Sequence, residues 1–290
     1  MSKSVLVTGS QGQLAQEIFR IKELYSDYNF NFVDRQTLDL SEVQILEDYF
    51  DANSYDIIIN CAAYTAVDAA ESDKVMARLV NENAVECLAD IAKKKKISLI
   101  HISTDYVFDG THNRPYLEDD TVAPQSVYGE TKLGGENAMI RMNPSNSIII
   151  RTSWVYSSFG SNFVKTMLRL GNERDELGVI FDQVGTPTYA YDLAKAILDI
   201  LGKLSNKDVE IYNYSNEGVC SWYDFAKAIF ELSGTNCKVN PIETSAYPTP
   251  AQRPHYSLLN KTKIKNTFGL EIPYWKDALQ ECLKTLKENK

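Results

Sequence analysis

A tyrosine and a lysine four residues apart, Tyr128 and Lys132, are the side chains whose types and spacing most directly suggest chemistry. On a helix this spacing places both side chains on one face. A tyrosine hydroxyl has a reference pKa of about 10, and a neighbouring ammonium is expected to lower it by favouring the phenolate. The pair could then act as a general acid near neutral pH. The alternative is that both side chains serve only packing.

A hydroxyl pair, Ser103 and Thr104, ends an apolar run that is typical of a buried strand. We expect the Thr104 hydroxyl to hold a substrate carbonyl oxygen beside Tyr128. His101 lies two residues before Ser103 on the same run, and we interpret it as a packed strand residue rather than a catalytic one. The predicted catalytic set is therefore Thr104, Tyr128 and Lys132.

A glycine turn with the spacing G-x-x-G-x-x-A runs from Gly9 to Ala15, directly after a short apolar run. Small residues allow a tight turn between a strand and a helix, so that backbone N–H groups approach a pyrophosphate at the helix N-terminus. A plain strand–helix turn is the alternative. The cofactor contacts that we predict lie in this turn, at the ends of the next two strands and in the catalytic pair: Gly9, Ser10, Gln11, Gly12, Gln13, Leu14, Asp34, Arg35, Asp39, Leu40, Cys61, Ala62, Ala63, Tyr64, Tyr128 and Lys132.

Two adjacent residues point to different nicotinamide cofactors. Asp34 ends the second predicted strand, where an acidic side chain would bond the ribose hydroxyls of NADH. Arg35 follows it and would instead meet the 2′-phosphate of NADPH. We expect NADPH, with NADH possible.

Apolar runs alternate with amphipathic segments through the first half of the chain, whereas the second half is less regular. Continuous β-branched runs between helices indicate a parallel sheet covered on both faces, and right-handed crossovers then give a doubly wound, Rossmann-like α/β fold. Ser41 and Ser221 are candidate helix N-caps. Strands are predicted at 4–7, 30–34, 56–60, 98–103, 147–152, 179–181 and 211–214, helices at 13–24, 43–50, 75–95, 133–142, 190–204, 221–233 and 275–287, and a proline-rich loop at 247–254.

The length of 290 residues fits a large α/β domain with a smaller appended lobe. Residues 1–155 are predicted to form the dinucleotide-binding Rossmann domain, to which 179–204 and 211–214 return. The smaller C-terminal substrate-binding lobe is predicted to comprise 156–178 and 215–290.

The composition limits the possible partners and the location. A net charge of −9 argues against nucleic acid or an anionic membrane as the main partner. No segment is apolar for long enough to span a membrane, and no signal peptide is expected. The five cysteines are scattered without a CxxC pair, so we expect reduced thiols, no zinc site and a cytoplasmic location.

Together these motifs resemble the extended short-chain dehydrogenase/reductase superfamily and, within it, the dTDP-4-dehydrorhamnose reductase family. The resemblance runs nearly end to end. Its last stretch, YPTPAQRP, is the most specific, because generic superfamily members do not share it. The stretches that carry the resemblance are NCAAYTAVD at 60–68, STDYVFDG at 103–110, YGETKL at 128–133, RTSWVY at 151–156, GTPT at 185–188 and YPTPAQRP at 247–254.

The resemblance implies an NAD(P)H-dependent oxidoreductase that reduces the C4 ketone of dTDP-4-dehydro-L-rhamnose to dTDP-L-rhamnose, with Tyr128 giving the proton. This is a step of dTDP-rhamnose biosynthesis, which supplies cell-surface polysaccharide. Arg253 would meet the diphosphate, because its planar fork suits phosphate oxygens. A core role for Trp154 and a surface role for Arg253 are the alternatives. The substrate contacts implied are Thr65, Val67, Thr104, Tyr106, Trp154, Asn162, Phe163 and Arg253.

The chain departs from the family pattern at a metal site. Some members are described as dimers bridged by Mg²⁺ held by acidic side chains, and Glu17 matches one such position. Tyr191 stands where a second acid would be, and a C-terminal ligand is also missing. One carboxylate cannot hold Mg²⁺ tightly. We therefore expect no structural metal, and a monomer or weak homodimer.

Two other functions compete with this reading. An epimerase or dehydratase acting on another nucleotide sugar would share the superfamily, but dehydratases usually carry an Asp-Glu pair where this chain has Asp105-Tyr106. A non-catalytic, NADP-binding regulatory subunit could share the fold as well, since a fold alone never proves a function.

Overall fold

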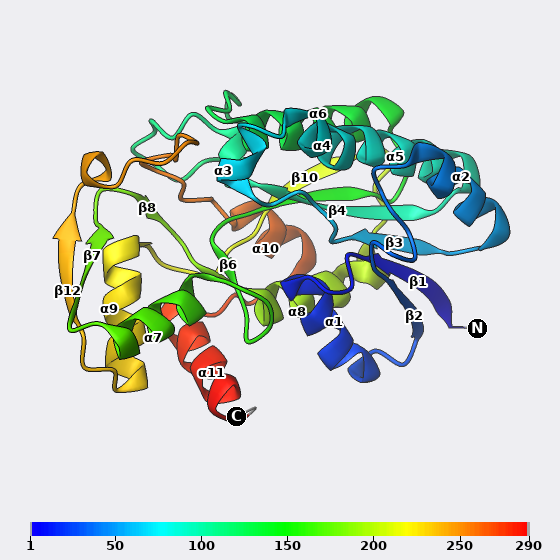
Figure 1. Cartoon of the computed structure of the whole chain (residues 1–290). Helices are drawn as coiled ribbons and strands as arrows, with labels where there is room; N and C mark the ends of the chain where they lie inside the picture. The colour runs from blue at the N-terminus through cyan, green and yellow to red at the C-terminus, as the bar shows by residue number, and fades with distance from the viewer. Residues whose placement is uncertain (1, 289–290) are drawn as a thin grey trace.

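The computed structural model describes residues 2–288. Six parallel strands form one sheet in the order β10-β5-β4-β3-β1-β2 (Figure 1). This arrangement confirms the predicted doubly wound α/β fold. The strands of this sheet are β1 (Lys3–Thr8), β2 (Tyr28–Val33), β3 (Ile57–Asn60), β4 (Ser98–Thr104), β5 (Ile148–Thr152) and β10 (Glu210–Asn213).

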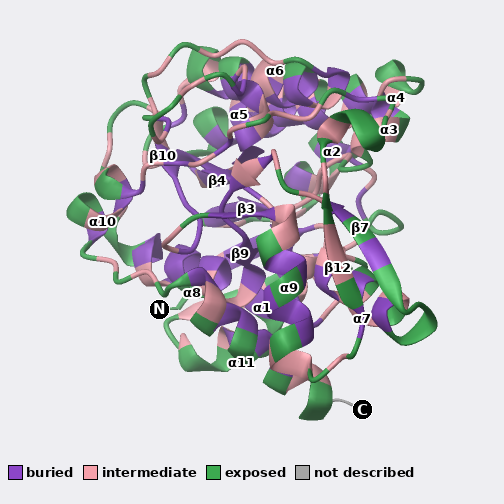
Figure 2. Cartoon of the chain, turned by 90° about the vertical axis from the view of Figure 1, so that its left-hand side faces the viewer, coloured by how far each residue is buried: buried purple, intermediate pink, exposed green. Residues whose placement is uncertain are grey.

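Two helical layers bury the sheet from both faces, as Figure 2 shows. On β1, Val5 and Val7 pack into one layer and Leu6 into the other, as the alternation of side chains along a strand requires. Each buried side chain of this kind contributes roughly 1.5–3 kcal/mol relative to exposure. The helices are α1 (Gln13–Ile21) and α8 (Ala190–Ile200) on one face, and α2 (Val43–Ala52), α5 (Ala84–Lys95) and α6 (Val127–Met142) on the other.

The order of the strands reverses direction next to β1. The chain passes from β1 to β2 at one edge of the sheet and then builds β3, β4 and β5 on the opposite side of β1. Ligands of open parallel sheets bind at such a switch point, beyond the carboxyl ends of the strands. The glycine turn after β1 and the segment after β3 meet there.

A second, smaller lobe packs beside the sheet and appears at the left of Figure 1. Its core joins three helices to a parallel pair of strands, β7 (Glu176–Ile180) and β12 (Lys238–Ile242). The expected return of the chain to the main sheet at residue 179 is therefore corrected, because β7 pairs with β12. The return begins with α8, and the rest of the lobe division stays a prediction. The helices of this lobe are α7 (Phe163–Glu173), α9 (Trp222–Ser233) and α11 (Trp275–Glu288).

The remaining elements are short. β6 and β9 form a parallel pair, and β8 and β11 an antiparallel one. None of the helices within 2–288 is long and apolar enough to cross a membrane. The short elements are α3 (Val67–Ala70), α4 (Lys74–Arg78), β6 (Val155–Tyr156), β8 (Val184–Gly185), β9 (Thr188–Tyr189), β11 (Cys220–Ser221), α10 (Thr262–Phe268) and 3-10 turns at Lys22–Leu24, Asp105–Val107, Leu201–Lys203, Thr244–Ala246.

The helix predicted at 75–95 is interrupted by a π-helical turn at Leu79–Asn83. Buried Asn81 lies in this turn, accepts a hydrogen bond from the backbone N–H of Tyr64 (2.8 Å) and donates one to Thr131 (3.2 Å). The irregular turn thus fixes the segment after β3 against α6. π-helical turns are rare and frequently occur at functional sites.

Of the two predicted helix N-caps, one is confirmed and the other is wrong. Ser221 caps α9 in a full capping box, as predicted. Ser41 does not cap α2, because its hydroxyl donates to Asp39 and Glu42 holds the N-cap position.

Candidate active site

A cleft of about 1170 Å³ opens at the carboxyl ends of β1 to β4. Ser10 does not line it, because its backbone N–H is bonded to Val33 of β2. All the other predicted cofactor residues line it: Gly9, Gln11, Gly12, Gln13, Leu14, Asp34, Arg35, Asp39, Leu40, Cys61, Ala62, Ala63, Tyr64, Tyr128 and Lys132. Of the predicted substrate residues, five line it too: Thr65, Val67, Thr104, Tyr106 and Trp154.

The glycine turn has the shape that a phosphate-binding loop needs. Gly9 has φ +66°, and a Cβ atom there would lie 2.9 Å from the backbone of Ala62, so a larger residue would not fit. Gly12 is the N-cap residue of α1 and provides no side-chain cap, which leaves the first N–H groups of that helix without a side-chain acceptor. Such a terminus is suited to an anion. These residues fit the pyrophosphate of a dinucleotide.

Asp34 and Arg35 both lie at the adenosine end of the cleft. The Asp34 carboxylate accepts hydrogen bonds from Thr37 (2.9 Å) and from the Gln11 side chain (3.1 Å), and the bonds from Thr37 are the main reason that its pKa is lowered. Arg35 is exposed and pairs with Asp39 at 3.1 Å. The acidic and the basic side chain therefore both line the cleft.

Replacing Arg35 separates the two cofactors. We expect Arg35→Ala to raise the Kd for NADPH about 10-fold and to leave that for NADH nearly unchanged, because only NADPH carries a 2′-phosphate. Calorimetric titration of both cofactors measures this. Arg141→Ala, which removes another exposed arginine paired with Glu86, is the control. Equal changes in the two Kd values would contradict a 2′-phosphate contact.

The helix that carries Tyr128 and Lys132 begins with a serine cap and docks through a glycine. Ser126 accepts a hydrogen bond from the N–H of Gly129 at 3.2 Å, so α6 begins at residue 127 rather than at the predicted 133. A Cβ atom on Gly129 would come within 2.3 Å of the carbonyl oxygen of Tyr106, so only glycine lets α6 approach the end of β4. This close approach brings Tyr128 to Thr104, with the rings of Tyr106 and Tyr128 edge to face at 5.5 Å.

Lys132 is buried in the base of the cleft. Its ammonium donates to the carbonyl oxygen of Ile102 (2.6 Å) and lies 3.3 Å from Nε2 of His101. Burial lowers the pKa of Lys132 to about 8, against the opposing effect of the Glu136 carboxylate.

The pKa of Tyr128 is raised to about 12, not lowered as the sequence suggested. Burial is the main cause, a hydrogen bond with Thr104 acts against it, and the charge of Asp105 adds to it. The Lys132 ammonium has turned toward β4 and does not offset the burial. Tyr128 therefore keeps its proton at neutral pH, which is the state that a proton donor needs.

Asp105 is a buried carboxyl group that the sequence analysis did not assign to the site. Its Oδ1 accepts a hydrogen bond from the Thr104 hydroxyl at 3.0 Å, and Thr104 in turn accepts one from the N–H of Tyr106 (3.2 Å). Burial raises the pKa of Asp105 to about 6. Thr104 is thus held in place on both sides.

Trp154 forms a wall of the cleft in an unusual backbone conformation. Its φ is +49°, which is rare for a bulky side chain and tends to mark functional positions. Trp222 of α9, which the sequence analysis missed, stacks on it with 3.6 Å between ring centroids. Trp154 thus lines the cleft and also packs against the hydrophobic core of the smaller lobe.

Asn162 and Phe163 do not line the cleft, although both were predicted to contact substrate. Asn162 caps α7 and donates to the side chain of Gln13 at 2.8 Å. Phe163 packs against Trp222 in the smaller lobe. Asn162 therefore joins the smaller lobe to α1, whereas Phe163 packs within the smaller lobe.

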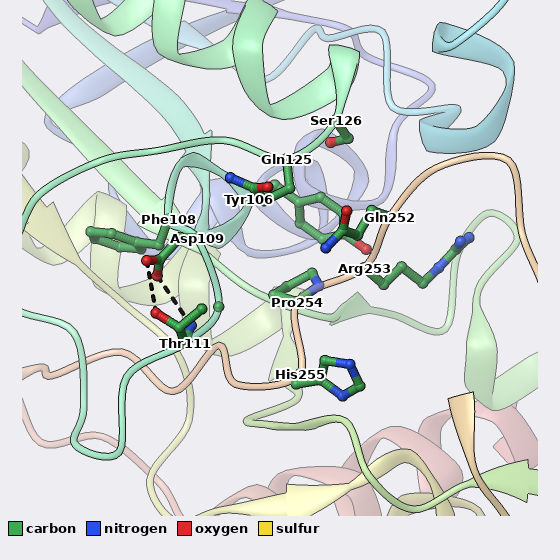
Figure 3. Close-up of a pocket in the computed structure, with 11 residues that line it drawn as sticks. Tyr106, Phe108, Asp109, Thr111, Gln125, Ser126, Gln252, Arg253, Pro254 and His255 are labelled. Carbon is green, nitrogen blue, oxygen red and sulfur yellow. Dashed lines mark hydrogen bonds between the residues drawn. The ribbon is translucent and has the colours of Figure 1, made fainter. Parts of the chain in front are cut away.

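Arg253 lies beside a small cavity of about 70 Å³ that shares Tyr106 with the large cleft (Figure 3). Its guanidinium extends away from Phe108 in this view and forms a forked ion pair with Asp68 of α3, at 3.1 and 2.8 Å. Asp68 was not predicted as a site residue. Because the pair joins loop 247–254 to α3, it spans the two lobes.

Glu17 is engaged inside the protein. It is fully buried, accepts a hydrogen bond from Ser157 at 2.6 Å and pairs with Arg20 at 3.1 Å. Burial raises its pKa. Within residues 2–288, no group of three or more His, Cys, Asp and Glu side chains is arranged to hold a metal ion.

Comparison with known proteins agrees with the fold and the cleft. The family described as RmlD substrate binding domain matches residues 3–288. A dTDP-4-dehydrorhamnose reductase of Sinorhizobium fredii is 41% identical over 97% of this chain and 96% of its own. The crystal structure of such a reductase from Clostridium acetobutylicum has a TM-score of 0.93 and 41% identity, covering 98% of this chain and 99% of the other. That of a Bacillus anthracis reductase in complex with NADP has a TM-score of 0.92 and 35% identity, covering 98% and 100%.

The doubly wound sheet and the nucleotide cleft define an NAD(P)H-dependent oxidoreductase of the extended short-chain dehydrogenase/reductase class. Within that class, the chain belongs to the dTDP-4-dehydrorhamnose reductase family.

Proposed function

We propose that Thr104, Tyr128 and Lys132 carry out the reduction of the C4 ketone of dTDP-4-dehydro-L-rhamnose to dTDP-L-rhamnose in this cleft. NADPH, when bound, supplies the hydride. The observation that carries the assignment is that half-buried Tyr128, whose raised pKa favours the protonated phenol, lies beside Thr104 in the same cleft as the glycine turn.

Each side chain has a defined task. Thr104 donates its single hydroxyl proton to Asp105 in this structure, and it would redirect that proton to the ketone oxygen in order to orient it. Tyr128 donates its phenolic proton to that oxygen as negative charge develops there. Lys132 places an ammonium at the base of the same cleft. It does not offset the burial of Tyr128 in this structure, and it would favour loss of the phenolic proton once one of its N–H groups faces the phenol. Trp154 closes the cleft over the sugar.

The assay that tests this function follows the oxidation of NADPH, and separately of NADH, with dTDP-4-dehydro-L-rhamnose generated in situ and EDTA present. We expect oxidation that depends on the sugar and is faster with NADPH. Tight NADP(H) binding without any turnover, even after Mg²⁺ is restored, would instead indicate a regulatory subunit or another nucleotide sugar. The Asp105-Tyr106 sequence favours reduction over dehydration, because the Asp-Glu pair of dehydratases is incomplete.

Arg253 is proposed to bind the diphosphate of the sugar nucleotide, for which it must exchange Asp68 for phosphate oxygens. We expect Arg253→Ala to raise the KM for the sugar roughly 10–100-fold, as losing charge-assisted hydrogen bonds implies, with little change in the KM for NADPH. Steady-state kinetics in both substrates measure this. Arg253→Lys keeps the charge but not the forked donors, so its KM for the sugar should lie between those of wild type and Arg253→Ala. An unchanged KM for the sugar would remove Arg253 from the pocket.

We also propose that the protein acts in the cytoplasm as a monomer or weak homodimer without a bridging metal. The five free thiols support a reducing compartment. The Glu17 carboxylate is already satisfied by Ser157 and Arg20, which supports the absence of a metal bridge. Light scattering during size-exclusion chromatography gives the molar mass of the protein in EDTA and in Mg²⁺. A metal-bridged dimer would dissociate only with EDTA.

A further inference from the structure

A chain of buried polar side chains continues from Lys132 into the sheet, behind the cleft. His101 of β4 lies 3.3 Å from the Lys132 ammonium, Asn60 of β3 lies 3.1 Å from the other ring nitrogen, and Thr8 of β1 donates to Asn60 at 2.7 Å. The three strand residues are at most 2% exposed. Thr8 pairs with Asn60, and Asn60 with His101, in the register of the sheet, so adjacent strands place them side by side.

The two ring nitrogens of His101 impose a constraint. Nε2 faces the ammonium nitrogen of Lys132, and Nδ1 faces the amide nitrogen of Asn60. A neutral imidazole has one donor nitrogen and one acceptor nitrogen, so it cannot accept from both neighbours. A charged Lys132 has only N–H donors, so Nε2 must be the acceptor and Nδ1 must carry the proton.

Asn60 can satisfy this requirement, because the oxygen and NH2 ends of an amide have nearly the same shape and can exchange places. With its oxygen toward Nδ1–H, its NH2 group faces the Thr8 hydroxyl, which can accept as well as donate. We propose that His101 is a positioning residue for the reduction: Asn60 holds it as the neutral Nδ1–H tautomer, and its Nε2 accepts a hydrogen bond from the charged Lys132. This inference rests on the proposed catalytic role of Lys132.

The charges around Lys132 are consistent with a neutral His101. Complete burial lowers the pKa of His101 well below its usual value, and the charge of Lys132 lowers it further. The Glu136 carboxylate on the same helix acts to raise the pKa of Lys132, and Arg151 of β5 pairs with Glu136. Tyr128 and Asp105 line the same cleft as Lys132. Burial should reduce the charge on Lys132, and an acceptor at Nε2 opposes that reduction.

The geometry explains why the acceptor matters. An ammonium has three donors. The carbonyl of Ile102 and the ring of His101 occupy two of them, which leaves the third for the cleft that Lys132 lines. Without His101, the ammonium would lose both a fixed direction and part of its stabilisation.

The direct test reads the tautomer and needs no substrate. The chain has three histidines, so imidazole ¹³C and ¹⁵N shifts of histidine-labelled protein can be resolved and assigned with a His101→Gln variant. We expect a neutral Nδ1–H ring for His101 from pH 6 to pH 8, roughly the range that its burial protects from protonation. An Nε2–H ring or a cation at pH 7 would overturn the proposal.

A second test uses the pH dependence of kcat for the NADPH-dependent reduction. We expect His101→Leu to shift the alkaline limb of the profile to lower pH by about one unit, the size expected for losing one hydrogen bond to a charged group. His101→Gln should largely restore the limb, because its amide oxygen can accept from Lys132. Leu99→Val, a substitution at a fully buried site on the same face of β4, is the control and should lower stability without moving the limb.

The outcomes separate this inference from the proposed function. If a folded and active His101→Leu variant shows an unshifted alkaline limb in its kcat profile, the positioning role is overturned. The proposed reductase activity would stand. An inactive wild-type protein would count against the proposed function, whereas the tautomer measurement would still decide the arrangement of His101 and Asn60.

Discussion

Tyr128→Phe should lower kcat by about 10²–10⁴-fold, the range that a general acid typically contributes. The substitution removes one hydroxyl and leaves the aromatic ring, which packs edge to face with Tyr106. The loss should therefore be chemical rather than structural. Pre-steady-state and steady-state NADPH oxidation measure it, and calorimetry should find the Kd for NADPH within about 3-fold of wild type, less than one hydrogen bond would change it.

The pH dependence adds a second condition. The raised pKa of Tyr128, about 12, keeps the donor protonated through neutral pH. Wild-type kcat should then show no loss from Tyr128 ionisation below pH 8, and any alkaline decline should follow Lys132, whose pKa is lowered to about 8. Tyr106→Phe removes the same group, a phenolic hydroxyl, from the neighbouring ring and is the comparison variant. Full activity in Tyr128→Phe would contradict the assignment of the acid.

Arg151→Met should lower the free energy of unfolding by about 3–5 kcal/mol, the cost of leaving a buried carboxylate without its partner. Arg151 and Glu136 form a forked pair at 2.7–3.2 Å, and both side chains are at most 3% exposed. Ser103 also donates to Glu136, and Arg151 donates to the backbone of Glu118. Urea denaturation followed by circular dichroism measures the change.

The double variant Arg151→Met with Glu136→Leu distinguishes the pair from simple packing. Removing both charges should recover most of the lost stability, because no ion is left unpaired. The exposed pair Arg169–Glu173 provides the surface control, and Arg169→Met should change stability by less than about 0.5 kcal/mol. A loss of under about 1 kcal/mol in Arg151→Met would show that Glu136 finds another partner or becomes protonated at little cost.

The parallel sheet and its nucleotide cleft could be predicted because their signals are local. Continuous apolar runs gave the strands, and the spacing of Gly9 and Gly12 gave the turn. Tyr128 and Lys132 were recognisable from a separation of one helical turn. The start of α6 was placed too late, because Gly129 near that start weakens a helical pattern. Gly134 and Gly135 lie further along the same helix. These glycines are required by neighbours that approach closely, such as the backbone oxygen of Asn81 at 2.2 Å from a Cβ at 135.

Other features depend on long-range contacts that the sequence does not display. The π-helical turn at Leu79–Asn83 leaves the apolar pattern of a helix nearly intact, so the segment was predicted as one helix. β7 was recognised as a strand, but its partner β12 lies about sixty residues later in the chain. The pairing of Asp68 with Arg253 joins two motifs that had each been noticed alone. The Lys132–His101 contact became visible only with the register of the sheet.

The stacked indoles of Trp154 and Trp222 give the cleft an intrinsic optical signal. They belong to different segments of the chain, one after the end of β5 and one at the start of α9, and Trp275 is the only other tryptophan in the sequence. Two parallel rings at 3.6 Å couple their transitions, so their circular dichroism reports the distance and angle between them. A sugar nucleotide that rests on Trp154, or any movement of α9 relative to β5, would change that band. Opening and closing of the site can therefore be followed in the unlabelled protein.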